Sequence, residues 1–95
     1  MGINMGRLSE LERLLKDLQL ANAKDDFAKL FRLACALLEF DDDAAAVAFD
    51  TSQPNASRWR RGEVVPPASA LVLKFVSEQV EMKIEKLRRL EAPDD

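Results

Sequence analysis

Hydrophobic residues recur along this chain at the three- and four-residue spacing that is typical of α-helices. The first such segment, residues 7–20, has a leucine seam with charged flanks, formed by Leu8, Leu11, Leu15 and Leu18. After a polar interruption, residues 27–40 carry a broader apolar stripe of Phe27, Leu30, Phe31, Ala34, Leu37 and Leu38. The seam covers only about one and a half heptads and must pack on another element. The broader stripe predicts the scaffold helix of the fold.

Residues 68–91 contain neither glycine nor proline, which allows one C-terminal helix, and residues 92–95 are predicted to be disordered. The first part of that helix is predicted to be buried against the scaffold helix through Leu71, Val72, Leu73, Phe75 and Val76. A thinner apolar line follows, made of Val76, Val80, Ile84, Leu87 and Leu90. The N-terminal seam of the same chain can cover this line, or a second copy can, in a bundle of both terminal helices. We favour the second copy, because the line is longer than a 95-residue monomer readily covers.

Between these segments, residues 45–62 have the pattern of a short helix, a tight turn and a second helix. At about 100° per residue, one face of segment 53–61 carries Ala56 and Trp59. The opposite face carries Gln53, Pro54, Ser57, Arg58 and Arg61. Ser52 can cap the start of this helix, and Gly62 suits the left-handed residue that ends it. We therefore predict a helix that rests on the core through a narrow apolar face and presents polar and basic side chains to solvent.

The outward face of this second helix has the residue types that read DNA. A helix of its size fits the major groove, which is about 12 Å wide. In that groove arginine bonds guanine bidentately, and glutamine does the same to adenine. Arg58 and Gln53 are therefore the candidate side chains for base contacts.

The run from Ala45 to Gly62, with the four residues that follow it, resembles the helix-turn-helix of the lambda-repressor and Cro-like (XRE) transcriptional regulators. The resemblance rests on a mid-helix alanine, a large apolar helix end, a Ser-Gln-Pro opening, a Ser-Arg-Trp core and a closing glycine and proline: Ala46, Phe49, Ser52, Gln53, Pro54, Ser57, Arg58, Trp59, Gly62 and Pro66. It implies a helix-turn-helix at residues 42–62. The implied fold is an all-α, five-helix lambda-repressor-like domain with an added N-terminal helix and a long C-terminal helix.

The resemblance also implies a role for each residue of the motif. Base edges would be contacted by Gln53, Pro54 and Arg58. The DNA backbone would be contacted by Ser57, Arg61 and Asn55. The core of the motif would consist of Ala46, Phe49, Ala56 and Trp59. The partner would be double-stranded DNA, bound by a homodimer on an inverted repeat whose half-sites lie about 34–36 Å apart.

Three features depart from the family pattern. Asp50 stands at a left-handed turn position where glycine is usual, a conformation that aspartate tolerates better than most residues. Thr51 replaces an aliphatic residue, and its methyl group can do part of the packing. The run Asp41, Asp42 and Asp43 opens the first helix of the motif. These carboxylates either cap that helix and favour its positive end, which is the interpretation we prefer, or repel DNA phosphates and dock a basic partner.

The composition fits one soluble helical domain, residues 1–95, with 47% hydrophobic and 33% charged residues. A core this small favours pairing with a second copy, and residues 7–20 and 68–91 are the expected dimerisation elements. The net charge of −3 argues against DNA binding, but residues 51–70 carry three arginines against one glutamate. Because charges are screened beyond about 8 Å, that local cluster can act although the whole molecule is acidic.

Other chemistry is sparse in this chain. The single cysteine, Cys35, excludes an intramolecular disulfide, and its apolar neighbours predict a buried hydrophobe rather than a redox sensor. The absence of histidine excludes the usual nitrogen and sulfur metal sites and histidine-based catalysis, so we expect no cofactor and no enzyme. No apolar run reaches the roughly 18 residues that cross a bilayer, and no signal peptide is visible. We therefore expect a cytoplasmic protein without a membrane partner.

The sequence thus predicts a sequence-specific DNA-binding transcriptional regulator, a small homodimeric repressor or co-regulator. The alternative is a protein-interaction module of the same fold, such as an antitoxin, anti-activator or adaptor, with weak or no DNA binding. Its acidic edge at Asp41, Asp42 and Asp43 would bind a basic partner. Val47 and Ala48 bear on this choice, because they are apolar at outward positions and must be covered by the N-terminal helix or by a partner.

Overall fold

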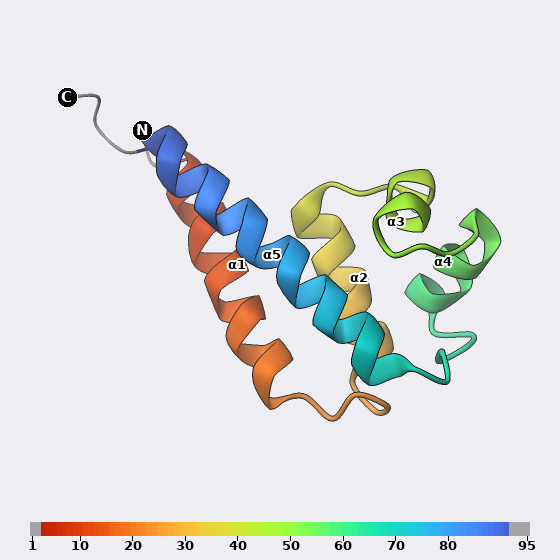
Figure 1. Cartoon of the computed structure of the whole chain (residues 1–95). Helices are drawn as coiled ribbons and strands as arrows, with labels where there is room; N and C mark the ends of the chain where they lie inside the picture. Colours follow the sequence, from red (N-terminus) through yellow and green to blue (C-terminus); the bar gives the residue numbers. More distant parts are fainter. Residues whose placement is uncertain (1–2, 92–95) are drawn as a thin grey trace.

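The structure, a computed structural model, describes residues 3–91 (Figure 1). These residues form five α-helices and no strand. The helices are α1 (Ile3–Leu20), α2 (Phe27–Leu38), α3 (Asp42–Ala48), α4 (Gln53–Arg61) and α5 (Ser69–Glu91). The prediction of an all-α chain is confirmed. The predicted disorder of residues 92–95 concerns positions outside the described range.

The scaffold helix α2 ends two residues before its predicted limit, because a left-handed residue closes it. Glu39 has a φ of 62°, and its backbone N–H donates to the Ala36 carbonyl at 3.2 Å. The N–H of Phe40 reaches back to the Cys35 carbonyl at 2.9 Å. These bonds satisfy carbonyl groups that the helix end would leave without partners, and they turn the chain toward α3.

Helix α2 is the centre of the fold and packs against α1, α4 and α5 (Figure 1). Helix α1 runs antiparallel to its two neighbours. Arg7 near its start forms an ion pair with Glu39 just after α2, and Glu12 forms one with Arg88 near the end of α5. Helices α3 and α4 pack on each other, and α4 also packs on α2. The scaffold role predicted for residues 27–40 is therefore observed.

An aromatic cluster joins α2 to the pair α3 and α4. The ring centroid of Phe31, which is fully buried, lies 5.4 Å from those of Phe27 and Phe49 and 5.7 Å from that of Trp59. Trp59 meets Phe27 and Phe31 edge-on, at interplanar angles of 87° and 82°. Such aromatic pairs contribute about 0.5–1.5 kcal/mol each beyond the area they bury. The single tryptophan of the chain thus fastens α4 to the scaffold.

The leucine seam of α1 faces the core at positions that differ in part from those predicted. Leu11, Leu14 and Leu18 are buried, whereas Leu8 and Leu15 are only partly covered. Helix α1 packs against both α2 and α5, so two neighbours set its covered face. That face is centred between Leu11 and Leu14, and the spacing of the leucines alone does not locate it.

The thinner apolar line of α5 is covered within the chain itself. Val76, Val80, Ile84 and Leu87 are at most 6% exposed, whereas Leu90 is 68% exposed. Helix α1 supplies this cover, because it packs along α5. The intramolecular alternative is therefore the one observed, and these residues need no second copy for their burial. The homodimer stays a prediction that requires another surface.

Two residues of α5 that were predicted to be buried against α2 are exposed. Leu71 is 50% and Phe75 38% exposed, while Val72, Leu73 and Val76 are buried. At about 100° per residue, five residues this close in sequence cannot share one face of a helix. The face between α1 and α2 accommodates the other three, and Leu71 and Phe75 fall outside it.

The placement of α1 predicts that Leu14→Ala destabilises the protein more than Leu15→Ala. Leu14 is 1% exposed, so its truncation leaves a cavity and should lower the free energy of unfolding by about 2–5 kcal/mol. Leu15 is partly exposed, and water can fill the space that its truncation leaves. Urea unfolding of the two variants measures the difference. Equal losses would contradict the observed orientation of α1.

Candidate nucleic-acid interface

Helix α4 begins and ends at the residues that the sequence predicts. The hydroxyl oxygen of Ser52 accepts a hydrogen bond from the Asn55 N–H at 3.2 Å, and Pro54 lies in the first turn. Gly62 closes the helix with a φ of 78°, and its N–H donates to the Trp59 carbonyl at 3.2 Å. Glycine suits this position because other residues are strained at such a φ. The predicted bounds 53–61 are therefore confirmed.

A tight turn with a left-handed residue joins α3 to α4. Asp50 has a φ of 54°, the conformation that its place in the motif predicts. The N–H of Thr51 donates to the Ala46 carbonyl at 2.9 Å and closes the turn. The Thr51 side chain is half-buried, so it takes part in the packing. We refer to residues 41–63 as the α3–α4 unit.

The inward side of the α3–α4 unit fixes its orientation on the scaffold. Ala56 is fully buried and Trp59 is 8% exposed, so the narrow apolar face of α4 lies where the helical pattern predicts it. Phe49 at the end of α3 is 4% exposed. Ala46 packs against the core while part of its surface stays exposed. The backbone of the unit is thus held from one side.

The outward face of α4 brings together the residues that the sequence assigns to DNA. Ser57 is half-buried, and the exposed members are Gln53, Pro54, Asn55, Arg58 and Arg61. Arg61 forms an ion pair with Glu63, with 3.3 Å between Nε and Oε2. Both side chains are 53% exposed, so solvent screens this pair strongly. Among the described residues, none forms an ion pair with Arg58.

The remaining arginine of α4, Arg60, joins α4 to α3 through Asp42. Arg60 Nε lies 3.0 Å from Asp42 Oδ1, and Arg60 Nη2 lies 3.2 Å from Oδ2. The hydrogen bond from Arg60 holds the pKa of Asp42 below its ordinary value of 3.8, against a smaller opposing effect of burial. Residues 18 positions apart on different helices leave no local pattern in a sequence, so this pair was not predicted. It engages the Arg60 guanidinium within the α3–α4 unit, while 38% of that side chain stays exposed.

The three aspartates that open α3 have different environments. Asp41 is the N-cap, and its Oδ1 accepts a hydrogen bond from the Ala44 N–H at 2.8 Å. Asp42 is paired with Arg60, and Asp43 is exposed in the first turn. The preferred interpretation, helix capping, is therefore observed at Asp41. Asp43 alone of the three has no bonded partner among residues 3–91.

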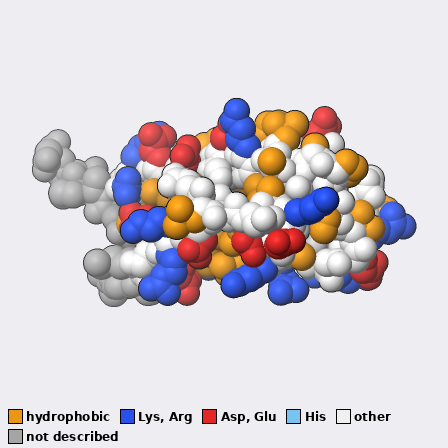
Figure 2. Space-filling view, turned by 90° about the horizontal axis from the view of Figure 1, so that it is seen from below, with side chains coloured by type: hydrophobic (Ala, Val, Ile, Leu, Met, Phe, Trp, Pro, Cys, Tyr) orange, Lys and Arg blue, Asp and Glu red, His pale blue; other side chains and the backbone are white. Residues whose placement is uncertain are grey.

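The α3–α4 unit is not basic as a whole. It carries five carboxylates and three arginines. Figure 2 shows acidic, basic and hydrophobic side chains interspersed over the face of the molecule seen from below. Any contact with nucleic acid must therefore depend on a few placed side chains rather than on a broad positive field.

Val47 on α3 projects into solvent. It is 84% exposed, and the neighbouring Ala48 is half-buried. Helix α1 packs on α2 and α5, so it does not cover Val47. The prediction that the N-terminal helix covers Val47 is therefore wrong. The other alternative, a partner that covers it, stays a prediction.

An open hollow of about 420 Å³ lies between α2 and the Asp42–Arg60 pair. Its lining includes Cys35, which is 3% exposed. Burial raises the pKa of the Cys35 thiol to about 11, so the sulfur stays protonated and poorly nucleophilic at neutral pH. The prediction of a buried hydrophobe at this position is confirmed.

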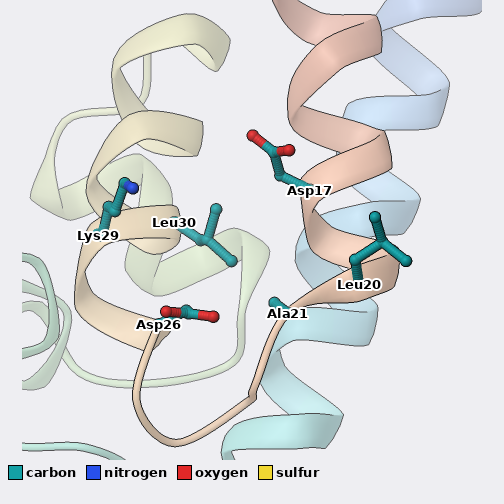
Figure 3. Close-up of a pocket in the computed structure, with 6 residues that line it drawn as sticks. All are labelled: Asp17, Leu20, Ala21, Asp26, Lys29 and Leu30. Carbon is teal, nitrogen blue, oxygen red and sulfur yellow. The ribbon is translucent and has the colours of Figure 1, made fainter.

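A second hollow, of about 270 Å³, lies at the connection between α1 and α2 (Figure 3). Three lining residues come from the α1 side and three from the α2 side: Asp17, Leu20, Ala21, Asp26, Lys29 and Leu30. Asp26 has a structural role there, since its carboxylate accepts a hydrogen bond from the Asn22 N–H at 3.0 Å. Within residues 3–91, no cluster of three acidic or cysteine side chains could hold a metal ion, and no helix has the length and hydrophobicity to span a bilayer.

Comparison with known proteins assigns no family to this chain. No protein-family model, no curated protein and no solved structure matches it. The relation to the lambda-repressor and Cro-like regulators is therefore a resemblance carried by residues 45–66. What the chain does has to be argued from the α3–α4 unit itself.

The Asp42–Arg60 pair predicts a pH-dependent difference between Asp42→Asn and the wild type. Because the folded-state pKa of Asp42 is lowered, its carboxylate stabilises the fold above the unfolded pKa of about 3.8. That contribution is lost as the pH falls through the lower folded-state pKa. The thermal unfolding midpoint of Asp42→Asn should therefore lie below the wild-type midpoint at pH 7, and the two should converge well below pH 3.8.

Asp43→Asn is the matched control for this measurement. It removes the same charge from the adjacent, exposed position and should change the midpoint less. A gap between Asp42→Asn and the wild type that persists in strong acid, or that is missing at pH 7, would show that the ion pair does not join α3 to α4 in solution.

Proposed function

We propose that this protein is a sequence-specific transcriptional regulator that binds double-stranded DNA as a homodimer on an inverted repeat. The observation that carries the proposal is the two-sided construction of α4. Ala56 and Trp59 fasten one side to the core, while Gln53 and Arg58 stay exposed on the other. An amide and a guanidinium on a short, well-anchored helix are the groups that discriminate base pairs in the major groove.

In this proposal the outward side chains of the α3–α4 unit divide into two groups. Gln53 and Arg58 hydrogen-bond to base edges, and Pro54 contacts a thymine methyl group. The sugar-phosphate backbone is bound by Asn55, Ser57 and Arg61. Arg61 can exchange Glu63 for a phosphate, because their pair is exposed and screened.

The charge of the α3–α4 unit predicts a shallow salt dependence of DNA binding. With Arg60 held by Asp42, each subunit offers Arg58 and Arg61 to the DNA. A dimer then neutralises roughly two to four phosphates, and the log–log slope of affinity against salt should be roughly −2 to −4. Tight binding at physiological salt therefore requires the DNA contacts of both subunits together.

Arg58→Ala should weaken binding to the specific DNA site and relax its sequence preference at one base pair. Loss of a bidentate contact to guanine costs about 1–3 kcal/mol, which corresponds to roughly a 5- to 150-fold loss of affinity per contact. Gel retardation with the DNA upstream of the protein's own gene, followed by binding to single-base variants of the bound site, measures both effects.

Arg89→Ala is the control for the Arg58 experiment. Arg89 is also an exposed arginine, with a side chain 75% accessible, but it lies on α5 and pairs with Glu85. Its removal changes the net charge equally and should leave site preference unaltered. Unchanged affinity and unchanged preference in Arg58→Ala would remove the basis of the DNA-binding proposal.

A second candidate function is supported by the surface of α3. Val47 is 84% exposed, and the α3–α4 unit has more carboxylates than arginines. These features suit a protein-interaction module, such as an antitoxin, anti-activator or adaptor that binds a basic partner. The salt series separates the two functions, because a DNA reader retards its site at low salt and a module of this kind does not. If DNA is the partner, Asp43→Asn should tighten binding by removing a carboxylate near the phosphates.

A further inference from the structure

The Asp42 carboxylate lies against one edge of the outward face of α4. Its partner Arg60 follows Ser57 by three residues and Gln53 by seven, so at about 100° per residue its side chain stands next to theirs on the helix. Arg61 follows Ser57 by four residues and stands on the other side of it. A carboxylate from α3 thus meets a row of polar and basic side chains that continues into the candidate DNA face.

The pKa of Asp42 reflects three groups of this row. The hydrogen bond from Arg60 lowers the pKa most, against an opposing effect of burial, and the Ser57 hydroxyl and the charge of Arg61 lower it further. Ser57 and Arg61 are two of the three residues to which the proposed function assigns the DNA backbone. The carboxylate therefore lies among groups that are proposed to bind phosphate.

The contact between Arg60 and Asp42 has the geometry of an arginine bound to a phosphate. Two nitrogen atoms of the guanidinium, Nε and Nη2, donate to the two carboxylate oxygens at 3.0 and 3.2 Å. A phosphodiester also presents two free oxygens that share one negative charge, and arginine binds carboxylates and phosphates through the same pair of donors. The Asp42 carboxylate is therefore a chemical substitute for a phosphate group at this place.

The ion pair is partly open to solvent. The Arg60 side chain is 38% exposed and that of Asp42 22%. The open hollow of about 420 Å³ between α2 and the pair is lined by both residues. A phosphate group can therefore approach Arg60 while the α3–α4 unit stays folded, but the guanidinium that it approaches is already occupied.

We propose that Ser57, Arg60 and Arg61 form a phosphate-binding site, and that Asp42 occupies it in the free protein as an internal competitor of DNA. The site adds Arg60 to the residues that the proposed function assigns to the DNA backbone. Asp42 withholds this arginine, so attraction to the backbone stays weak and the base contacts of α4 decide where the protein binds. The inference rests on the proposed function and concerns the regulation of its DNA interface.

Asp42→Ala empties the site and should strengthen binding to DNA of arbitrary sequence. The freed Arg60 neutralises one more phosphate per subunit, so the log–log slope of affinity against salt should become steeper by about 0.9 per subunit, or roughly 2 for a dimer. At low salt the affinity should rise about tenfold or more. Fluorescence anisotropy of a labelled duplex across a salt series measures both quantities.

Two control variants separate this effect from net charge and from stability. Asp43→Ala removes the same charge from the adjacent, exposed position without releasing an arginine, so it should strengthen binding less and leave the salt slope unaltered. Arg60→Ala breaks the same ion pair as Asp42→Ala but leaves no guanidinium to bind phosphate, so it should not strengthen binding. If the pair only held α3 on α4, both Asp42→Ala and Arg60→Ala would weaken binding, and that result would overturn the proposal.

The site is also testable without DNA, through the thermal unfolding midpoint in sodium phosphate compared with sodium chloride at equal ionic strength. In Asp42→Ala, inorganic phosphate replaces the lost carboxylate at Arg60, and a ligand that binds the folded state stabilises it. The midpoint of Asp42→Ala should therefore rise by several degrees more than that of the wild type. The double variant Asp42→Ala with Arg60→Ala corrects for the general stabilisation by phosphate and should show no such excess.

The two experiments distinguish a failure of the site from a failure of the proposed function. Selective stabilisation of Asp42→Ala by phosphate, in a protein that retards no DNA, would support the site and remove the DNA-binding proposal. DNA binding in which Asp42→Ala and Asp43→Ala behave alike would keep the proposed function and refute the site. Equal effects of phosphate on the wild type, Asp42→Ala and the double variant would refute the site as well.

Discussion

The edge-on contact of Trp59 with Phe27 and Phe31 is the interaction on which the rest of the molecule's chemistry depends. Helix α4 has nine residues and buries two of them, Ala56 and Trp59. A helix this short is not stable alone in water, so it takes its position from the ring that anchors it. Phe31 also contacts Phe49, which closes the end of α3. Phe31 of α2 therefore anchors both helices of the α3–α4 unit. Every outward side chain of α4 is placed relative to that cluster.

The Asp42–Arg60 pair adds an electrostatic constraint to this aromatic one. It ties α3 to α4 at two points, and it pairs one carboxylate with one arginine inside the α3–α4 unit. Asp41 is engaged at the first turn of α3, so the acidic run is a cap, an internal pair and one open charge rather than a uniform barrier. The chemistry left on the outer surface is consequently polar and sparsely cationic, which suits recognition by placed contacts better than attraction by net charge.

Local signals in the sequence were sufficient for α4. Ser52 and Gly62 mark its ends, Asp50 marks the turn, and a single apolar face points to Trp59; all of these depend on residues a few positions apart. The buried faces of α1 and α5 were harder to predict. Each of these helices packs on two others, so the part of its surface that is covered depends on where those neighbours lie. For that reason the buried Leu14 was left out of the predicted seam, and Phe75 was wrongly predicted to be buried. The Asp42–Arg60 pair has no local signature in the sequence at all. The base-reading roles of Gln53 and Arg58 stay predictions, since exposure is a property of any binding surface.

Helix α5 closes the core against α1 and α2 with one face and leaves Leu71, Phe75 and Met82 exposed on another. In an acidic molecule non-specific attraction to DNA is weak, so a single α4 gains little beyond its base contacts. Joining two copies makes the second half-site contact intramolecular and multiplies the affinity without adding charge. Under the proposed function, α4 then sets which sequence is bound and the pairing of two copies sets how tightly, and a chain with a net charge of −3 can discriminate sites because it has little non-specific binding to overcome.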